Sequence, residues 1–237
     1  MKRERCAILD VIMTIRIALI HATPLAIEPI NSAMGQWPGA EAVNLLDDAL
    51  SVDRARGGAQ LDDAMFVRFE RLVRYAESIG AHGVLFTCSA FGPAIERAAR
   101  ATKLPVLKPN EAMFDEAIDA SHKTGRLGMV VTFAPSVESM RDEFLETVAR
   151  RNAISHTARE LEVVLAAGAM ESMRAGDSST HDRLITEAAA KLGDCDAIML
   201  AQFSMARALP LVQRRVRVPV LTSPDSAVTR MRAILSR

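Results

Sequence analysis

Short runs of apolar residues alternate along this chain with longer segments in which apolar residues recur every three or four positions. Most of the short runs are continuously apolar, which is typical of parallel strands covered by helices on both faces. The expected strands are residues 15–20, 42–46, 83–87, 105–107, 127–132, 160–165, 197–201 and 219–221. Their regular alternation with helices predicts βαβ units, a parallel sheet and therefore the α/β fold class.

The longer segments have the period of amphipathic helices. From Met65 to Ile79 the apolar residues follow one another at steps of four and three, and Gly80 then favours the end of a helix. The segment 184–192 repeats this pattern before Gly193, with helix caps expected at residues 178–180. Helices of this length can serve as the crossovers between parallel strands.

The two halves of the chain resemble each other. In the first half, Gly-Val-Leu-Phe-Thr leads to Cys88, and Pro105 follows 17 residues later. In the second half, Ala-Ile-Met-Leu-Ala leads to Gln202, and Pro219 again follows 17 residues later. The matched spacing predicts a duplicated α/β unit in which Cys88 and Gln202 occupy equivalent positions.

We therefore expect two pseudo-symmetric lobes, each with a four-stranded parallel sheet flanked by helices. The first lobe takes residues 14–109 together with 223–237, and the second takes 110–222. Residues 1–13 are expected to form an N-terminal extension, and Met13 is an alternative start. Ligands of open parallel sheets bind beyond the carboxyl ends of the strands, so we expect an active site in the cleft between the lobes, with Cys88 facing Gln202.

Composition excludes several classes of partner. Lys plus Arg and Asp plus Glu both number 29, so the formal net charge is zero. Nucleic acids and anionic membranes select for excess positive charge, so neither is an expected partner, whereas low net charge favours a homo-oligomer. The sequence has no apolar run of about 18 residues that would span a bilayer. Three scattered cysteines without metal or phosphate-loop motifs predict a cytoplasmic protein with no metal and no cofactor.

Cys88 is the strongest candidate for chemistry. It follows an expected strand and precedes an expected helix, where free backbone N–H groups and the helix dipole favour a thiolate. We therefore expect the pKa of this thiol to lie below its ordinary value of about 8.5. The alternative is a cysteine buried in the core, as most free cysteines are. Cys6 and Cys195 do not lie at a strand end and are expected to be incidental.

Polar residues at other strand ends are candidates for binding. The amide of Gln202 could donate to an enolate oxygen or a carboxylate, or be a solvated loop amide. Further candidates for substrate binding follow strands or flank Cys88 and Gln202, namely Thr23, Ser89, Thr132, Ser136 and Ser204. Each of these hydroxyls is equally consistent with a helix cap.

Histidine and lysine give two further candidates. His21 ends the first expected strand and could act as a second acid or base, or it could be structural. The other histidines, His82, His122, His156 and His181, fall at turns or helix ends and are expected at the surface. Lys108 follows the fourth strand and could neutralise a substrate carboxylate or extend along the surface.

The segments Leu-Phe-Thr-Cys88-Ser-Ala, 44–50 and 132–136, with the internal repeat, resemble the aspartate/glutamate/hydantoin racemase superfamily. This superfamily includes arylmalonate decarboxylase and maleate isomerase. The resemblance covers nearly the whole chain from Thr14 and implies an enzyme without cofactor. Its racemases use two cysteines, one from each lobe, and its decarboxylase keeps only that of the second lobe. This chain departs from both patterns because it has Cys88 in the first lobe and Gln202 in the second.

The resemblance implies a small carboxylate or an amino-acid-like carbon acid as substrate. The expected reaction is racemisation or isomerisation, in which Cys88 transfers a proton through an enolate-like intermediate. Two enzymatic alternatives are decarboxylation of the arylmalonate type and cis–trans isomerisation with Cys88 as nucleophile. A two-lobed protein that only binds small carboxylates is the non-enzymatic alternative.

Overall fold

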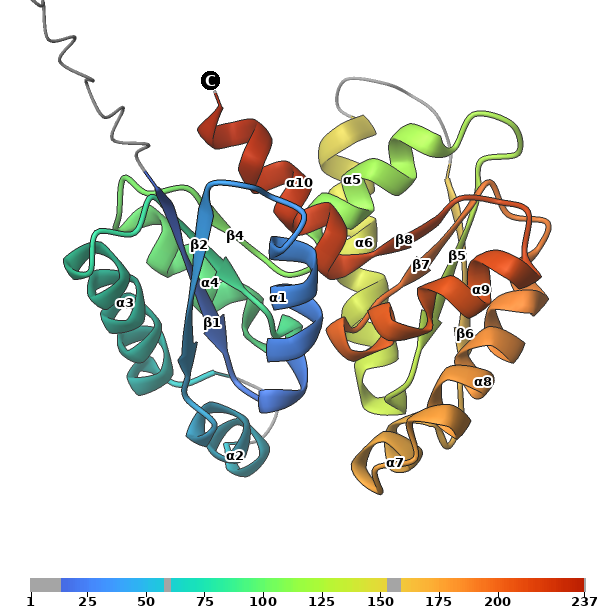
Figure 1. The fold of residues 1–237 in the computed structure, drawn as a ribbon, viewed down its shortest axis with the longest axis horizontal. Helices are drawn as coiled ribbons and strands as arrows, with labels where there is room; N and C mark the ends of the chain where they lie inside the picture. The colour runs from blue at the N-terminus through green and yellow to red at the C-terminus, as the bar shows by residue number, and fades with distance from the viewer. Residues whose placement is uncertain (1–13, 58–60, 153–158, 237) are drawn as a thin grey trace, which may run out of the picture.

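The computed structural model describes residues 14–57, 61–152 and 159–236, and it has two α/β lobes side by side (Figure 1). The expectations for the extension 1–13, for Met13, for Cys6 and for His156 fall outside the described residues. The predicted two-lobed architecture is confirmed, because the described residues form two separate four-stranded parallel sheets.

The two sheets have the same strand order. The first lobe has the order β2-β1-β3-β4 and the second has β6-β5-β7-β8. The strands are β1 (Ile15–His21), β2 (Ala40–Leu46), β3 (Gly83–Phe86), β4 (Val106–Leu107), β5 (Arg126–Val131), β6 (Glu160–Leu165), β7 (Ala197–Leu200) and β8 (Val220–Thr222). Each observed strand overlaps a predicted one, and the shared order agrees with the duplicated unit inferred from the sequence. The inner strands β3 and β7 are fully buried, which explains their continuous apolar runs.

Helices cover both faces of each sheet. The main helices are α1 (Ile27–Met34), α2 (Ala49–Arg56), α3 (Asp63–Ser78), α4 (Gly92–Arg100), α5 (Glu111–Ala120), α6 (Val137–Asn152), α7 (Ala169–Arg174), α8 (Ser178–Ala189), α9 (Leu209–Arg215) and α10 (Ser223–Leu235). In the first lobe, α3 and α4 pack on one face, and α1 and α10 on the other. In the second lobe, α8 and α9 pack on one face, and α5 and α6 on the other.

At the junction of the lobes, residues that follow strands of the second sheet pack in the core of the first lobe. Helix α10 follows β8 of the second sheet, yet its Met231 packs in the core of the first lobe with Ile17. Gly83 permits this approach, because a Cβ atom there would lie 2.6 Å from the sulfur of Met231. Phe203, just after Gln202, is buried in the same first-lobe cluster. The two lobes therefore share one hydrophobic cluster at their junction.

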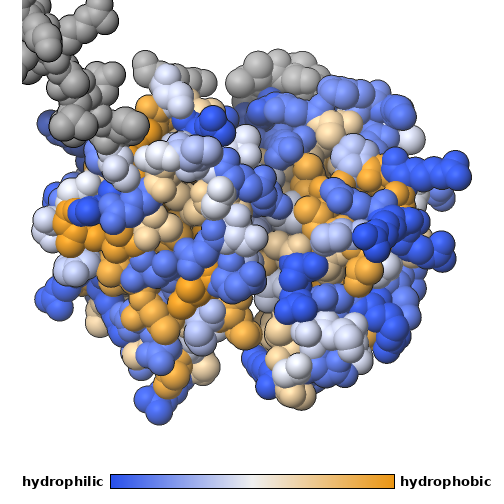
Figure 2. All heavy atoms as spheres, viewed as in Figure 1, coloured by the Kyte–Doolittle hydropathy of each residue, from blue (hydrophilic) through white to orange (hydrophobic). Residues whose placement is uncertain are grey.

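The carboxyl ends of both sheets lie along one edge of the molecule. The strand arrows of both lobes point toward the lower part of Figure 1, where α2 and α7 also lie. In the same view, the space-filling surface has a notch between the lobes at this lower edge (Figure 2). Among the described residues, no helix is both long enough and apolar enough to cross a membrane.

Candidate functional site

Cys88 lies on the turn that follows β3 of the first lobe. It precedes a short 3-10 helix, η2 (Ser89–Phe91), and α4 begins only at Gly92. The Cys88 side chain is partly buried and packs against the apolar cluster beneath α3 and α4. Cys88 therefore stands at the carboxyl edge of its sheet, as the sequence predicted, but one turn away from the helix.

The expected low pKa of Cys88 is wrong for the free protein. Burial raises the pKa of the thiol, and a hydrogen bond from the backbone N–H of Ala90 offsets only part of this effect. The sequence argument assumed that the helix dipole would dominate, but the intervening 3-10 turn separates the thiol from α4. Cys88 is therefore a protonated thiol at neutral pH.

His21, the last residue of β1, is buried rather than exposed at the site. Its Nδ1 lies 2.9 Å from Oγ1 of Thr87, and its Nε2 lies 2.9 Å from Oδ1 of Asn44. Because the Asn44 oxygen accepts, Nε2 carries the proton and Nδ1 accepts from the Thr87 hydroxyl. Asn44 in turn donates to Asn31 of α1 over 3.1 Å.

This network corrects the expectation that His21 is an acid or base at the substrate. Its side chain is fully buried, and both ring nitrogens already have partners. Burial lowers the pKa of His21, and the hydrogen bond to Asn44 opposes this only in part, so the ring is neutral. The ring is placed to orient Thr87, the residue before Cys88.

Gln202 holds the corresponding place in the second lobe. It follows β7 and precedes the 3-10 helix η5 (Phe203–Ala208). Its backbone is extended, with φ −118° and ψ 146°, close to the φ −128° and ψ 120° of Cys88. Cys88 and Gln202 are therefore equivalent in position and in local conformation.

Two other predicted site residues, Thr132 and Ser136, meet Gln202. Its Oε1 accepts a hydrogen bond of 3.1 Å from the backbone N–H of Thr132, and its Nε2 lies 3.3 Å from the Oγ of Ser136, to which it donates. The turn after β5 and the turn after β7 are joined by these bonds. The amide of Gln202 is thus held in a fixed orientation at the carboxyl edge of the second sheet.

The remaining hydroxyls are less favourably placed. Thr23 accepts from the backbone N–H of Leu25 at 3.4 Å and caps the 3-10 turn η1 (Pro24–Ala26). Ser204 is buried within η5, so its predicted contact with a substrate is not supported by its position. Ser89 is half-exposed beside Cys88 and stays accessible to a ligand.

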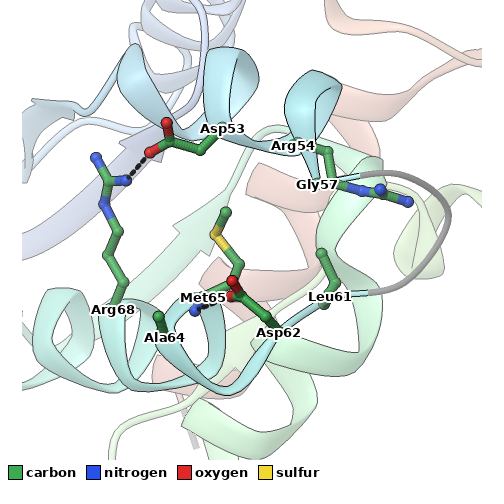
Figure 3. A pocket seen from close by; sticks show the side chains of 8 residues that line it. All are labelled: Asp53, Arg54, Gly57, Leu61, Asp62, Ala64, Met65 and Arg68. Atoms are coloured by element: carbon green, nitrogen blue, oxygen red, sulfur yellow. Dashed lines mark hydrogen bonds and ion pairs between the residues drawn. The ribbon is translucent and has the colours of Figure 1, made fainter.

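A hollow of about 180 Å³ lies close to the Cys88 turn, between α2 and α3 (Figure 3). It is lined by Asp53, Arg54, Gly57, Leu61, Asp62, Ala64, Met65 and Arg68. The Nε of Arg54 donates to the carbonyl of Ala90 at 3.4 Å, which joins the hollow to the turn that carries Cys88. Sequence reasoning missed this hollow, because its walls are charged helix residues without a motif.

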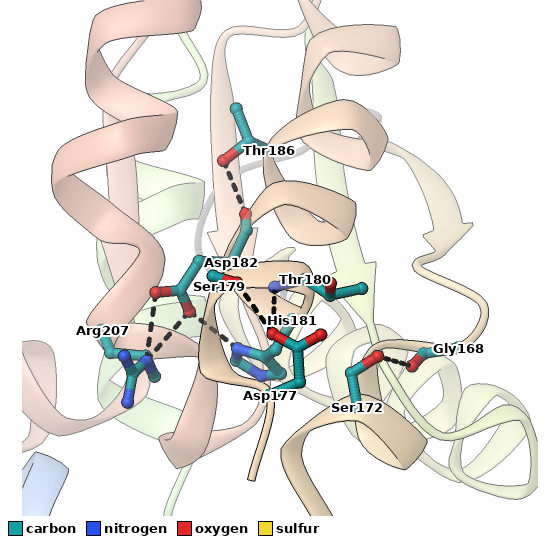
Figure 4. Close-up of polar contacts among 9 residues, drawn as sticks. All are labelled: Gly168, Ser172, Asp177, Ser179, Thr180, His181, Asp182, Thr186 and Arg207. Atoms are coloured by element: carbon teal, nitrogen blue, oxygen red, sulfur yellow. Dashed lines mark hydrogen bonds and ion pairs between the residues drawn. The ribbon is translucent and has the colours of Figure 1, made fainter. Parts of the chain in front are cut away.

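A chain of three charged or polar side chains was also missed (Figure 4). His181 Nδ1 lies 2.8 Å from Oδ1 of Asp182, and Nε of Arg207 lies 3.0 and 3.1 Å from the two oxygens of Asp182. The expectation of a surface position for His181 is wrong, because its side chain is 1% exposed. Asp177, just before the expected caps, accepts from the backbone N–H of Thr180 and caps α8.

Lys108 belongs to a polar group where the chain passes between lobes. Its Nζ pairs with Glu96 at 2.7 Å, so it is not held ready for a substrate. Burial raises the pKa of nearby Glu143 to about 7, although the charge of Lys108 and a hydrogen bond from Asn110 lower it. Among the described residues, no three His, Cys, Asp or Glu side chains gather as a metal site.

Solved structures with this fold cover nearly the whole chain. Allantoin racemase from Klebsiella pneumoniae is 19% identical with a TM-score of 0.69, and covers 94% of this chain and 88% of its own. Aspartate racemase from Picrophilus torridus is 13% identical with a TM-score of 0.69, covering 94% of each chain. A Gly74Cys mutant of arylmalonate decarboxylase is 19% identical with a TM-score of 0.56, covering 92% and 93%. These likenesses show the two-lobed fold.

A comparison with curated protein sequences found no match. The family model described as Asp/Glu/hydantoin racemase matches residues 22–231, which begin just after β1, end within α10 and include both turns described above. The sequence resemblance and the duplicated sheet order agree with this match. The chain belongs to the Asp/Glu/hydantoin racemase family.

Proposed function

We propose that this protein is a cofactor-independent enzyme of the racemase and isomerase type, acting on a small carboxylate or an amino-acid-like carbon acid. Cys88 transfers a proton at carbon through an enolate-like intermediate. The observation that carries the proposal is the equivalence of Cys88 and Gln202, each on the turn after the third strand of its sheet. A substrate in the notch between the lobes would have one of these residues on each side.

The two residues take different parts in this mechanism. In the racemase-type reaction, the thiolate form of Cys88 takes the α-proton, the electron pair stays on the substrate as an enolate, and the resulting S–H returns a proton to the α-carbon. The raised pKa of the free thiol favours the S–H form, which is the proton donor of the second step. Gln202 has no titratable proton, but its amide is fixed by Thr132 and Ser136. Its Nε2 also lies 3.6 Å from the sulfur of Met140, a weak acceptor that a substrate oxygen would have to replace. A fixed amide donor stabilises negative charge on an enolate or carboxylate oxygen without rearranging in the transition state. Proton transfer therefore proceeds from the Cys88 side.

Decarboxylation is a second candidate, favoured by the protonated state of the single thiol. In this reaction the bond between the α-carbon and one carboxylate breaks, CO2 leaves, and the electron pair remains as an enolate. The Cys88 S–H then gives its proton to the α-carbon, and water restores the thiol. Such a reaction needs only a proton donor on one side, which agrees with a glutamine at the equivalent position.

Isotope exchange in deuterated water tests the proposal. The protein is incubated with amino acids, hydantoins and arylmalonic acids, and deuterium at the α-carbon and CO2 release are followed by NMR. We expect incorporation with at least one class, and its loss in Cys88→Ser. Cys195→Ala is the matched control, because it removes a buried thiol from the second lobe. Full activity of Cys88→Ser on an accepted substrate would refute the mechanism. If the wild-type protein turned over none of these substrate classes, the result would favour a binding protein.

A further inference from the structure

Arg207 lies on the turn that carries Gln202. This turn, η5, leaves β7 at the carboxyl edge of the second sheet, and its first residue, Phe203, is anchored in the core of the first lobe. The same turn contacts η1, which follows β1 of the first lobe. Arg207 thus belongs to the segment that joins the two carboxyl edges, and its side chain is 40% exposed.

The guanidinium of Arg207 is held by only one of its three nitrogens. Nε donates to both oxygens of Asp182, while Nη1 and Nη2 have no hydrogen-bond partner among the described residues. Figure 4 shows these two nitrogens pointing away from Asp182. The pair Nη1 and Nη2 presents parallel N–H groups, which match the two oxygens of a carboxylate.

Asp182 is itself fixed from behind by His181. A carboxylate can only accept hydrogen bonds, so Nδ1 of His181 carries the proton and donates to Oδ1 over 2.8 Å. Nε2 of His181 is buried without a hydrogen-bond partner in the described chain. The buried histidine therefore orients Asp182, and Asp182 orients the guanidinium.

Two other arginines show what purely structural pairing looks like in this protein. Arg68 in the first lobe uses Nε and Nη2 on Asp47 and Nη1 on Asp53, so all three nitrogens are occupied. Arg183 on α8 pairs with Glu187 one turn later, and both side chains are 57% exposed. Arg207 differs from both, because a buried carboxylate holds one side of the guanidinium and leaves the other for a ligand.

The geometry points to Arg207 as the residue that binds a carboxylate group of the substrate, with Asp182 and His181 as positioning residues. This inference rests on the proposed function, because it assigns a contact for the carboxylate of that substrate. The positive charge of Arg207 beside the substrate carboxylate would also stabilise the negative charge of an enolate that forms next to it. Arg207 would thus contribute to binding and Cys88 to proton transfer.

Binding of malonate, compared with the neutral malonamide, tests the assignment without requiring turnover. We expect the wild-type protein to bind malonate more tightly than malonamide by calorimetry, and Arg207→Gln to bind malonate roughly 10- to 100-fold more weakly. Arg183→Gln is the matched control, since it removes an equal charge from an exposed pair nearby. Equal malonate affinity in the wild type and Arg207→Gln would overturn the inference, as would a wild-type protein that does not bind malonate.

The positioning role of His181 has its own test. His181→Leu should weaken malonate binding in the folded protein, whereas His181→Asn should preserve it, because the asparagine amide can donate from near the Nδ1 position. Thermal unfolding of both variants measures any loss of stability separately. Unchanged malonate affinity in folded His181→Leu would overturn the role of His181. Malonate binding through Arg207 without isotope exchange for any acid would instead refute the proposed enzymatic function alone.

Discussion

The Nδ1 atom of His21 lies 2.9 Å from Oγ1 of Thr87, the residue immediately before Cys88. The backbone N–H of Thr87 also donates a hydrogen bond to the carbonyl of Ile20 on β1. Two connections to the end of β1 therefore fix the backbone that presents the candidate thiol. A neutral imidazole suits this role, because it can accept from Thr87 and donate to Asn44 at the same time.

We expect His21→Leu to lose about 1–3 kcal/mol of stability, because the two hydrogen bonds that join the imidazole to Thr87 and Asn44 would be lost. The same variant should lose activity through the misplaced Cys88 turn, and His21→Gln should recover part of both. Chemical denaturation and the isotope-exchange rate measure the two effects. A fully active and fully stable His21→Leu protein would show that this network does not position Cys88.

The pH dependence of the same network has a defined sign. The pKa of His21 is lower in the folded protein than in the unfolded chain, so the unfolded state binds the extra proton first. Its contribution to the free energy of unfolding should be complete above pH 6.5 and fall as the pH decreases below that value. His21→Gln should have a flatter profile of unfolding free energy between pH 7 and 5 in denaturation experiments. Identical slopes of unfolding free energy against pH in the wild type and His21→Gln would contradict the lowered pKa of His21.

Labelling with iodoacetamide tests the raised pKa of Cys88. Only the thiolate reacts, so labelling at pH 7 should be slow and should increase through a midpoint above that of an ordinary cysteine, about 8.5. The site of labelling is identified by mass spectrometry, with Cys88→Ala defining the reaction of the other thiols. A midpoint below pH 8 would show that the helix dipole outweighs burial, as the sequence alone had suggested.

The contrast between Cys88 and His181 shows what sequence patterns can reveal here. The strand end before Cys88 and the matching strand end before Gln202 were predictable, because continuous apolar runs mark buried parallel strands. The burial of His181 was not, because its helix α8 packs against η5 and α9, which are distant in sequence and meet it only in the folded lobe. The pKa of Cys88 was misjudged because a short 3-10 turn separates it from α4 and burial then dominates.

Placing a second thiol opposite Cys88 tests the equivalence of the two turns. Gln202→Cys should gain α-proton exchange, or racemase activity on an amino acid or hydantoin, because both faces of the substrate would then meet a thiol. Gln202→Ala is the control, since it removes the amide bonded to Thr132 without adding a thiol. For a substrate turned over by the wild type, Gln202→Ala should be slowed roughly 100-fold if the amide stabilises an enolate. Equal exchange rates in the two variants would argue that position 202 does not face the substrate.

Glu143 should make the stability of the protein depend on pH near neutrality. Its Oε1 is buried without a hydrogen-bond partner among the described residues, and burial raises its pKa to about 7. The charged groups that face it are Lys108, Glu111 and Glu146, of which Lys108 lowers the pKa and the two glutamates raise it. The folded state therefore retains a proton that the unfolded chain releases at lower pH. Stability from this group is complete below pH 4.5 and is lost as the pH rises through about 7.

Glu143→Gln should remove this dependence, because glutamine keeps the shape of the protonated acid and carries no charge. We expect the variant to be more stable than the wild type at pH 8.5, by about 3 kcal/mol at most, and the difference to shrink toward pH 5. Glu138→Gln is the matched control on the same helix, since its side chain is exposed and is not among the charged groups that face Glu143. Urea denaturation at a series of pH values measures all three proteins. If the difference in unfolding free energy between Glu143→Gln and the wild type stayed constant from pH 5 to 8.5, Glu143 would not titrate in this window. Lys108 would then keep the Glu143 carboxylate ionised throughout.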